Sequence, residues 1–162
     1  MQGFVIYALP VGRGTLALAP LPGAGGDYDG DMAHIRDWKP AMVISLTTPA
    51  EMLDAGAGSM AADVQDAGTR WVSLPIKDLD VPAYDQIEAW EKASMTARGA
   101  LAGGGRVLIH CRAGCGRSGM VALRLMIEAG ENPAEALRRL RQIRPCAVET
   151  EAQLGWARRV RG

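Results

Sequence analysis

The sequence lacks a hydrophobic run long enough to cross a membrane, which takes about 18 continuous apolar residues. Its first residues, MQGFVIYALPVG, include an apolar run but no basic residue before it, and the length is wrong for a secretory signal. The formal net charge is zero, so no excess of one sign favours nucleic acid or an acidic membrane surface as a partner. We therefore expect a soluble protein that binds neither.

Cysteine and histidine are scarce, with three of the first and two of the second. An odd number of cysteines argues against a closed disulfide framework and favours a reducing, cytoplasmic setting. His34 has no cysteine or carboxylate at a ligand spacing, and we predict no metal site and no cofactor. Lysine is also rare, at 3 against 15 arginines, and with the abundant alanine this suggests a GC-rich bacterial genome.

The chain of 162 residues is 48% hydrophobic, which predicts one globular domain over residues 1–162, and we expect a monomer. Two short apolar runs around PVGRG predict an N-terminal hairpin, and three more apolar runs predict strands at 41–46, 69–76 and 106–111. LPGAGGDYDGD reads as a loop, and MAHIRDW as one or two helical turns. Longer helices are predicted over 49–67 (broken near GAGS), 83–102, 117–129, 133–144 and from 151 onward.

Two of these helices carry start signals. Asn132, Pro133 and Glu135 form an N-cap, a proline at the first helical position and a capping-box acid, and Thr150 with Gln153 repeats the capping pattern. The helix over 117–129 is apolar on most sides, so it should lie at the centre of the fold. Strands that alternate with helices predict an α/β fold, with a mostly parallel central sheet flanked by helices on both faces and an N-terminal β-hairpin.

Residues 109–120 read IHCRAGCGRSGM and join a buried strand to a helix. The first amides of a helix are unpaired and carry a partial positive charge, so such a junction binds anions readily. Cys111 opens the loop, and a helix N-terminus and an arginine beside a thiol favour its ionised, nucleophilic form. Arg117 offers a planar fork of donors that matches two oxygens of a phosphoryl group. The stretch predicts a loop that binds an oxyanion and directs a nucleophile at it.

Three other interpretations of this loop are weaker. Residues 114–119 spell G-x-G-x-x-G, but the dinucleotide fingerprint needs a further strand that ends in an acid about 20 residues on, and only helices follow here. A nucleotide P-loop needs Gly-Lys-Ser/Thr, where this sequence has Gly-Arg-Ser. A glycine turn with a buried cysteine explains the glycines but neither Cys111 nor Arg117.

The ten residues HCRAGCGRSG resemble the signature of the cysteine-dependent protein tyrosine phosphatases: His-Cys, five residues, Arg, then Ser or Thr and Gly. The short chain and the segment LPIKDLDVP resemble the dual-specificity branch, whose phosphatase fold the resemblance implies. SLTTPAEM and RPCAVETEAQ are similar to stretches of kinase-associated-phosphatase-like members. The resemblance spans roughly residues 40–155 and does not include the N-terminal hairpin.

The resemblance implies a role for each matching residue. Cys111 resembles the nucleophile that takes the phosphoryl group, Arg117 the arginine that holds its oxygens, and Ser118 the hydroxyl that stabilises the departing sulfur. His110 resembles a histidine that orients the loop without attacking. Gln153 resembles a glutamine that positions the hydrolytic water, and its alternative role is to cap the helix with Thr150. The backbone amides implied to cradle the phosphate belong to Arg112, Ala113, Gly114, Cys115, Gly116 and Arg117.

IKDLDVP offers two candidate proton donors, Asp78 and Asp80, after a predicted strand. In a parallel sheet this loop lies at the same edge as the loop after RVLIHC, so either aspartate could face Cys111. Relatives with PI-x-D place the acid at the first aspartate, which favours Asp78. Asp80 then has the role of a turn or cap before Pro82.

The other two cysteines receive no catalytic role. Cys115 lies inside the loop, where a spacer role is favoured over a redox role, and Cys146 stands where relatives often have glycine after RP. Both are possible resolving partners for an oxidised Cys111.

We therefore expect a phosphoric monoester hydrolase that acts through a cysteinyl-phosphate intermediate, on phosphotyrosine, phosphoserine or phosphothreonine of proteins. Two alternatives share the fold: a pseudophosphatase that only binds phosphate, and a phosphatase of inositol lipids or other small phosphate esters, whose loops tend to carry extra lysines. A rhodanese-like sulfur transferase also uses a loop cysteine, but it should lack the Arg-Ser-Gly helix start.

Overall fold

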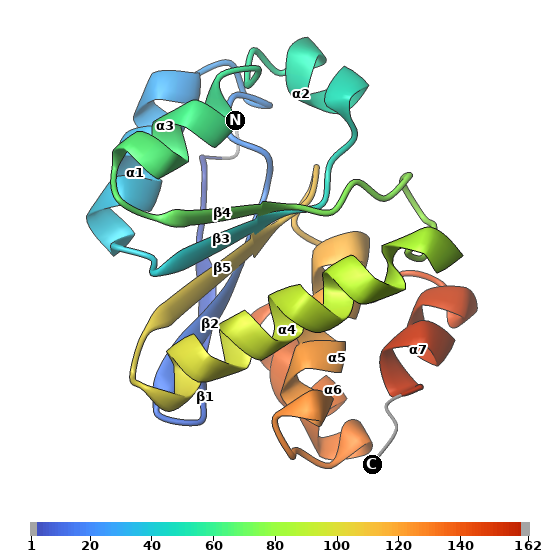
Figure 1. The fold of residues 1–162 in the computed structure, drawn as a ribbon. Coiled ribbons are helices and arrows are strands. Elements are labelled where there is room, and N and C mark those ends of the chain that lie inside the picture. The colour runs from blue at the N-terminus through green and yellow to red at the C-terminus, as the bar shows by residue number, and fades with distance from the viewer. Residues whose placement is uncertain (1–2, 160–162) are drawn as a thin grey trace.

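The computed structural model describes residues 3–159, which fold around a five-stranded sheet (Figure 1). The first half of the chain forms β1 (Tyr7–Val11), β2 (Gly14–Ala19), α1 (Tyr28–Trp38), β3 (Met42–Ser45), α2 (Pro49–Asp54), α3 (Met60–Asp66) and β4 (Arg70–Ser73). The second half forms the 3₁₀ turn η1 (Tyr84–Gln86), α4 (Ile87–Ala102), β5 (Arg106–His110), α5 (Gly116–Glu128), α6 (Pro133–Ile143) and α7 (Glu151–Arg158).

The strand order in the sheet is β1-β2-β5-β3-β4. β1 pairs antiparallel with β2, whereas β2, β5, β3 and β4 all run parallel. β5 lies at the centre, between β2 and β3, with Ile109 in register with Leu18 on one side and Ile44 on the other. The mostly parallel sheet and the N-terminal hairpin are therefore confirmed, and the carboxyl ends of four strands meet at one edge.

The two faces of the sheet have separate cores, because successive strand residues point to opposite sides. Ala17, Val43 and Leu108 pack with the buried residues of α1 and α3. The next residues along these strands, Leu18, Ile44 and Ile109, point to the opposite face. They pack there with α4, α5, α6 and α7 (Figure 1). Helices on both faces confirm the predicted α/β architecture.

Helix α5 is the most deeply buried helix, as its apolar sequence predicts. Ten of its thirteen residues are buried, including Arg117 and Ser118 at its N-terminal end. Residues 111–115 connect β5 to the first turn of α5, so the buried strand and the buried helix hold this loop at both ends. None of the helices within residues 3–159 is long and apolar enough to cross a membrane.

Helix α1 is longer than predicted. It starts at Tyr28, within the stretch expected to be a loop, and extends over 11 residues. The reason is an N-cap at Asp27, whose carboxylate accepts a hydrogen bond from the Gly30 amide at 3.0 Å. The prediction of one or two turns for this segment was therefore wrong.

The predicted caps of the last two helices are present, with one difference. Asn132 accepts a hydrogen bond from the Glu135 amide at 3.1 Å, but the Glu135 carboxylate pairs with Arg138 instead of returning to the cap. Thr150 and Gln153 form a complete capping box at the start of α7. Both helices thus begin where the sequence indicates.

Candidate active site

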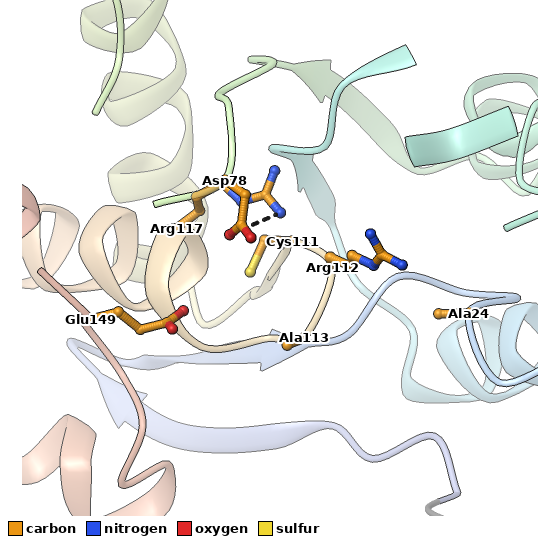
Figure 2. A pocket seen from close by; sticks show the side chains of 7 residues that line it. All are labelled: Ala24, Asp78, Cys111, Arg112, Ala113, Arg117 and Glu149. Atoms are coloured by element: carbon orange, nitrogen blue, oxygen red, sulfur yellow. Dashed lines mark ion pairs between the residues drawn. The ribbon is translucent and has the colours of Figure 1, made fainter. Parts of the chain in front are cut away.

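A pocket of about 330 Å³ lies where the carboxyl ends of the parallel strands meet (Figure 2). Segments that follow β2, β4 and β5 and the connection between α6 and α7 all contribute to it. Its lining residues are Ala24, Asp78, Cys111, Arg112, Ala113, Arg117 and Glu149. The pocket thus gathers the predicted nucleophile, arginine and acid from segments separated in the sequence.

The loop between Cys111 and α5 turns its carbonyl groups away from the pocket and holds them there. The Arg112 carbonyl accepts a hydrogen bond from the Leu21 amide at 3.0 Å. Arg144 donates to the Ala113 carbonyl at 2.9 Å and to the Gly114 carbonyl at 3.1 Å. Within residues 3–159, the N–H groups of residues 112–115 donate to no protein acceptor. The loop therefore presents free amides, as an anion-binding nest requires.

Two glycines allow this conformation. Gly114 has φ +73, and a Cβ there would lie 2.8 Å from the Ala19 carbonyl carbon. A Cβ on Gly116 would collide with the carboxylate of Glu149, which lies against the loop at that point. Glycine at 114 thus permits the left-handed turn, and glycine at 116 makes room for an acidic side chain beside the pocket.

Cys111 is a free cysteine, and 2% of its surface is exposed. Its Sγ lies 3.2 Å from the Ser118 Oγ and accepts a hydrogen bond from the Ser118 amide at 3.4 Å. Ser118 is fully buried in the first turn of α5. Both polar groups of Ser118 are therefore placed to stabilise negative charge on the sulfur.

The Arg117 guanidinium is buried and held by Glu51. Nη1 donates to Glu51 Oε1 at 2.7 Å and to the Ile76 carbonyl at 2.8 Å, while Nη2 donates to Glu51 Oε2 at 2.8 Å. The hydrogen bonds from Arg117 lower the pKa of Glu51 to about 2. Burial lowers the pKa of Arg117, but its hydrogen bonds and charge interaction with Glu51 outweigh burial and shift it upward. Both groups therefore stay charged near neutral pH.

One edge of the Arg117 guanidinium makes no hydrogen bond within residues 3–159 and has only a long ion pair with Asp78. Its Nε is buried and has no hydrogen-bond partner within residues 3–159, and Nη2 lies 3.6 Å from Asp78 Oδ1. Glu51 and Ile76 occupy the other donors. The Nε and Nη2 edge is thus available for the paired contact with two oxygens that an arginine makes to a phosphoryl group.

Glu51 was not identified in the sequence, although a signal for it was present. It is the last residue of the capping box that starts α2, where its Oε1 accepts a hydrogen bond from the Thr48 amide at 3.0 Å. The spacing Thr-x-x-Glu directly after a buried strand indicates this cap. That the same carboxylate also holds Arg117, 66 residues away, has no local signal.

The two aspartates of IKDLDVP lie in different places. Asp78 lines the pocket and is exposed, with 66% of its side-chain surface accessible. Asp80 lines a separate hollow with Val81 and Gln86, and its carboxylate accepts a hydrogen bond from the Val81 amide at 2.8 Å. This arrangement favours Asp78 over Asp80 as the group that can reach a bound substrate.

Gln153 is fully buried and does not line the pocket. Its Oε1 accepts hydrogen bonds from the Glu149 amide at 2.9 Å and the Thr150 amide at 3.2 Å, and its Nε2 donates to the Asp80 carbonyl at 3.3 Å. Of its two predicted roles, capping is the one that these contacts confirm. The side chain of this segment that reaches the pocket is Glu149, which sequence reasoning missed (Figure 2).

His110 is fully buried directly before the nucleophile. Its Nδ1 hydrogen-bonds to the Cys111 carbonyl at 3.3 Å, which fixes the backbone at the start of the loop. Burial lowers the pKa of His110 to about 4, so the ring is neutral near pH 7. The ring is thus placed to orient the loop.

Cys115 and Cys146 form a disulfide, which corrects the sequence analysis. The odd number of cysteines argued against a disulfide framework, and Cys115 was interpreted as a spacer. Because Cys111 stays free, the two remaining cysteines can pair although the total number of cysteines is odd. Cys115 and Cys146 are therefore bonded to each other, and neither is available as a resolving thiol for Cys111 in this state.

No group of three or more histidine, cysteine, aspartate or glutamate side chains within residues 3–159 is arranged to hold a metal ion. The chemistry available to the pocket from these residues consists of a thiol, two arginines, backbone amides without protein acceptors and two carboxylates.

Comparisons with known proteins agree with this geometry. The model of the family described as dual specificity phosphatase, catalytic domain, matches residues 53–160. The fold is similar to kinase associated phosphatase (KAP) with its catalytic-site cysteine replaced by serine, at TM-score 0.83 and 20% identity over 98% of this chain and 94% of that one. No curated protein sequence matches significantly.

Two further solved structures are similar. Tk-PTP in its active form has TM-score 0.67 and 27% identity, and the match covers 87% of each chain. PTPMT1 in complex with PI(5)P has TM-score 0.72 and 19% identity, over 93% of this chain and 92% of that one.

Proposed function

Because the chain belongs to the dual specificity phosphatase family, whose catalytic-domain model matches residues 53–160, we propose that it hydrolyses phosphate monoesters of proteins through a phosphocysteine on Cys111. The observation that carries the proposal is the loop itself. Residues 112–115, whose amides have no protein acceptor, and the Nε and Nη2 edge of Arg117 belong to the loop and helix start that border the pocket with Cys111. These groups match a phosphoryl dianion, and the sulfur lies where an in-line attack can begin.

In the first step the Cys111 thiolate attacks phosphorus and the bond from phosphorus to the ester oxygen breaks. The loop amides and Arg117 stabilise the charge on the three equatorial oxygens. The protonated Asp78 carboxyl gives its proton to the departing oxygen, so that the product leaves as a neutral alcohol or phenol. The enzyme is left as a phosphocysteine with Asp78 ionised.

In the second step water attacks the phosphocysteine, and the bond between sulfur and phosphorus breaks. Asp78, ionised by the first step, takes the proton of the attacking water, and inorganic phosphate leaves. The Ser118 hydroxyl donates a hydrogen bond to the departing thiolate of Cys111, and the two atoms lie 3.2 Å apart. Glu149 is a second carboxylate that faces the same space. This sequence of steps restores Cys111 and Asp78 for the next turnover.

The charges around the pocket favour a phosphoprotein as substrate. The lining contains two carboxylates, Asp78 and Glu149, against two arginines, Arg112 and Arg117. Arg117 is already paired with Glu51, so little positive charge is left for a second phosphate group. An inositol lipid phosphatase is the second candidate, because the similar PTPMT1 was crystallised with PI(5)P.

We expect hydrolysis of p-nitrophenyl phosphate in the presence of a metal chelator, and competitive inhibition by vanadate. Steady-state kcat/KM should be higher for phosphotyrosyl, phosphoseryl or phosphothreonyl peptides than for soluble phosphoinositides. The reverse order would replace the protein substrate with a lipid. Binding of phosphate without turnover of any ester would make the chain a pseudophosphatase.

The Asp78→Asn variant should lose about 10²–10⁴-fold in kcat on phosphopeptides, the usual contribution of a general acid. The loss should be much smaller for an activated aryl phosphate, whose leaving group hardly needs a proton, and the basic limb of the pH profile should flatten. The matched control is Asp80→Asn, which removes a carboxylate two residues away that lies outside the pocket. If Asp80→Asn gave this dependence on the leaving group and Asp78→Asn did not, the two roles would have to be exchanged.

A further inference from the structure

A short segment after α6 is attached to the phosphate-binding loop from outside the pocket. Arg144 donates to the Ala113 and Gly114 carbonyls, and its guanidinium lies 4.2 Å over the ring of Tyr7. Two residues further on, Cys146 is bonded to Cys115, with 5.2 Å between the two Cα atoms. The segment therefore contacts three consecutive loop residues, 113–115, through one side chain and one covalent bond.

The bond acts on a residue of the phosphate cradle itself. Cys115 is the N-cap residue of α5, and its amide is one of the free N–H groups of the loop. The residue before it, Gly114, has φ +73 and lacks the side chain that would restrict its backbone. A covalent bond directly after this glycine limits the conformations that the loop can sample when no phosphate is bound.

We propose that Cys146 is a positioning residue, which through its disulfide to Cys115 preorganises the loop amides and makes phosphate affinity depend on the thiol redox state. The inference rests on the proposed function for its catalytic consequence, but its effect on phosphate binding does not require turnover. The nucleophile is not part of this disulfide, because Cys111 is a free cysteine. Oxidation and reduction of this pair therefore leave the attacking sulfur unchanged.

The redox step is an ordinary exchange with a dithiol such as dithiothreitol. One thiolate of the reagent attacks a sulfur of the disulfide and releases the first cysteine as a thiolate. The second thiolate of the reagent then attacks the reagent sulfur of the mixed disulfide and releases the other cysteine. Two electrons pass to the protein, Cys115 and Cys146 become thiols, and the reagent becomes a cyclic disulfide. Cys146 is exposed, whereas Cys111 has 2% of its surface exposed, so the reagent can reach the bond from solvent.

Reduction should weaken phosphate binding without abolishing it. The two hydrogen bonds from Arg144 and the one from the Leu21 amide do not involve the disulfide, so we expect most of the loop to keep its outer contacts when the disulfide opens. The lost element is the restraint at Cys115. We therefore expect the effect in KM and in the dissociation constant for inorganic phosphate, with little change in kcat.

The experiment compares the full chain with the disulfide intact, verified by peptide mapping, with the same protein after dithiothreitol. Calorimetry with inorganic phosphate should give a dissociation constant about three- to tenfold higher for the reduced protein, the range expected when a preorganised loop must be ordered on binding. The kcat/KM for p-nitrophenyl phosphate should fall by the same factor, through KM. Thermal melting of the oxidised and the reduced protein should show that both are folded at the assay temperature.

The matched control is the double variant Cys115→Ser/Cys146→Ser. It should have the phosphate affinity and KM of the reduced protein and should not change with dithiothreitol, which separates opening of the disulfide from any protection of Cys111 by the reagent. Phosphate affinity that is equal in both redox states would overturn the inference, even if the melting temperature fell. So would peptide mapping of the oxidised protein that finds no bond between Cys115 and Cys146. A redox-dependent phosphate affinity in a protein without turnover would support it and reject the proposed function instead.

Discussion

Replacement of Cys111 by serine should abolish turnover while phosphate binding persists. A serine hydroxyl is not ionised near neutral pH, so the variant lacks the nucleophile and cannot form the covalent intermediate. The expected loss in kcat is on the order of 10⁶-fold, the size found when a covalent nucleophile is removed. The amides of residues 112–115 and the Arg117 guanidinium are unchanged by this substitution and still form the cradle.

Two measurements test this result. Steady-state assays with p-nitrophenyl phosphate should find no activity above the buffer rate, and calorimetry should find a phosphate affinity close to that of the unmodified protein. The kinase associated phosphatase was crystallised with the same kind of substitution, and that protein has the fold seen here. Appreciable turnover by the serine variant would remove the covalent mechanism. A variant that lost both turnover and phosphate binding would show that Cys111 supports the shape of the loop.

Replacement of Arg117 by lysine should be nearly as severe, because an ammonium group cannot make the paired contact to two phosphate oxygens. The variant also loses the two-pronged bond to Glu51 and the bond to the Ile76 carbonyl, which together orient the guanidinium. We expect kcat/KM to fall by about 10²–10³-fold, the effect of removing one donor that stabilises transition-state charge. Both kcat and phosphate affinity should decrease, in contrast to the serine variant of Cys111.

The matched comparison is Glu51→Gln, which keeps Arg117 but replaces the charged partner with an amide. The bidentate pair then loses one of its two contacts, since an amide has a single acceptor oxygen. This variant should have a smaller loss in kcat/KM than Arg117→Lys and should show it mainly in KM. Near-normal kcat/KM for Arg117→Lys would contradict the assignment of the phosphate clamp.

The sequence was most informative where the site is contiguous. The loop from Cys111 to Ser118 could be predicted because one strand, one turn and one helix start specify its shape within a dozen residues. The sheet topology predicted that the loop with Asp78 and Asp80 lies at this edge, and the family resemblance favoured Asp78, which lines the pocket. The α/β order followed from strands that alternate with helices.

The features that the sequence did not predict depend on contacts between distant segments. Glu51 lies 66 residues before its partner Arg117, and local patterns identify it only as a helix cap. Glu149 lines the pocket, whereas Gln153 is buried as part of the cap of α7, and no local sequence pattern distinguishes these two positions. The disulfide was missed because the parity of three cysteines carries no information once the nucleophile itself is one of them.

The position of β5 has a consequence for what constitutes a foldable unit. Both hydrogen-bonding neighbours of this strand, β2 and β3, come from residues that precede the stretch matched by the family model. A fragment cut to residues 53–160 would leave the strand before Cys111 with two bare backbone edges, which are templates for intermolecular pairing and aggregation. Fusion or truncation experiments on this protein must therefore keep both β2 and β3, although the phosphatase-like signature lies elsewhere in the chain.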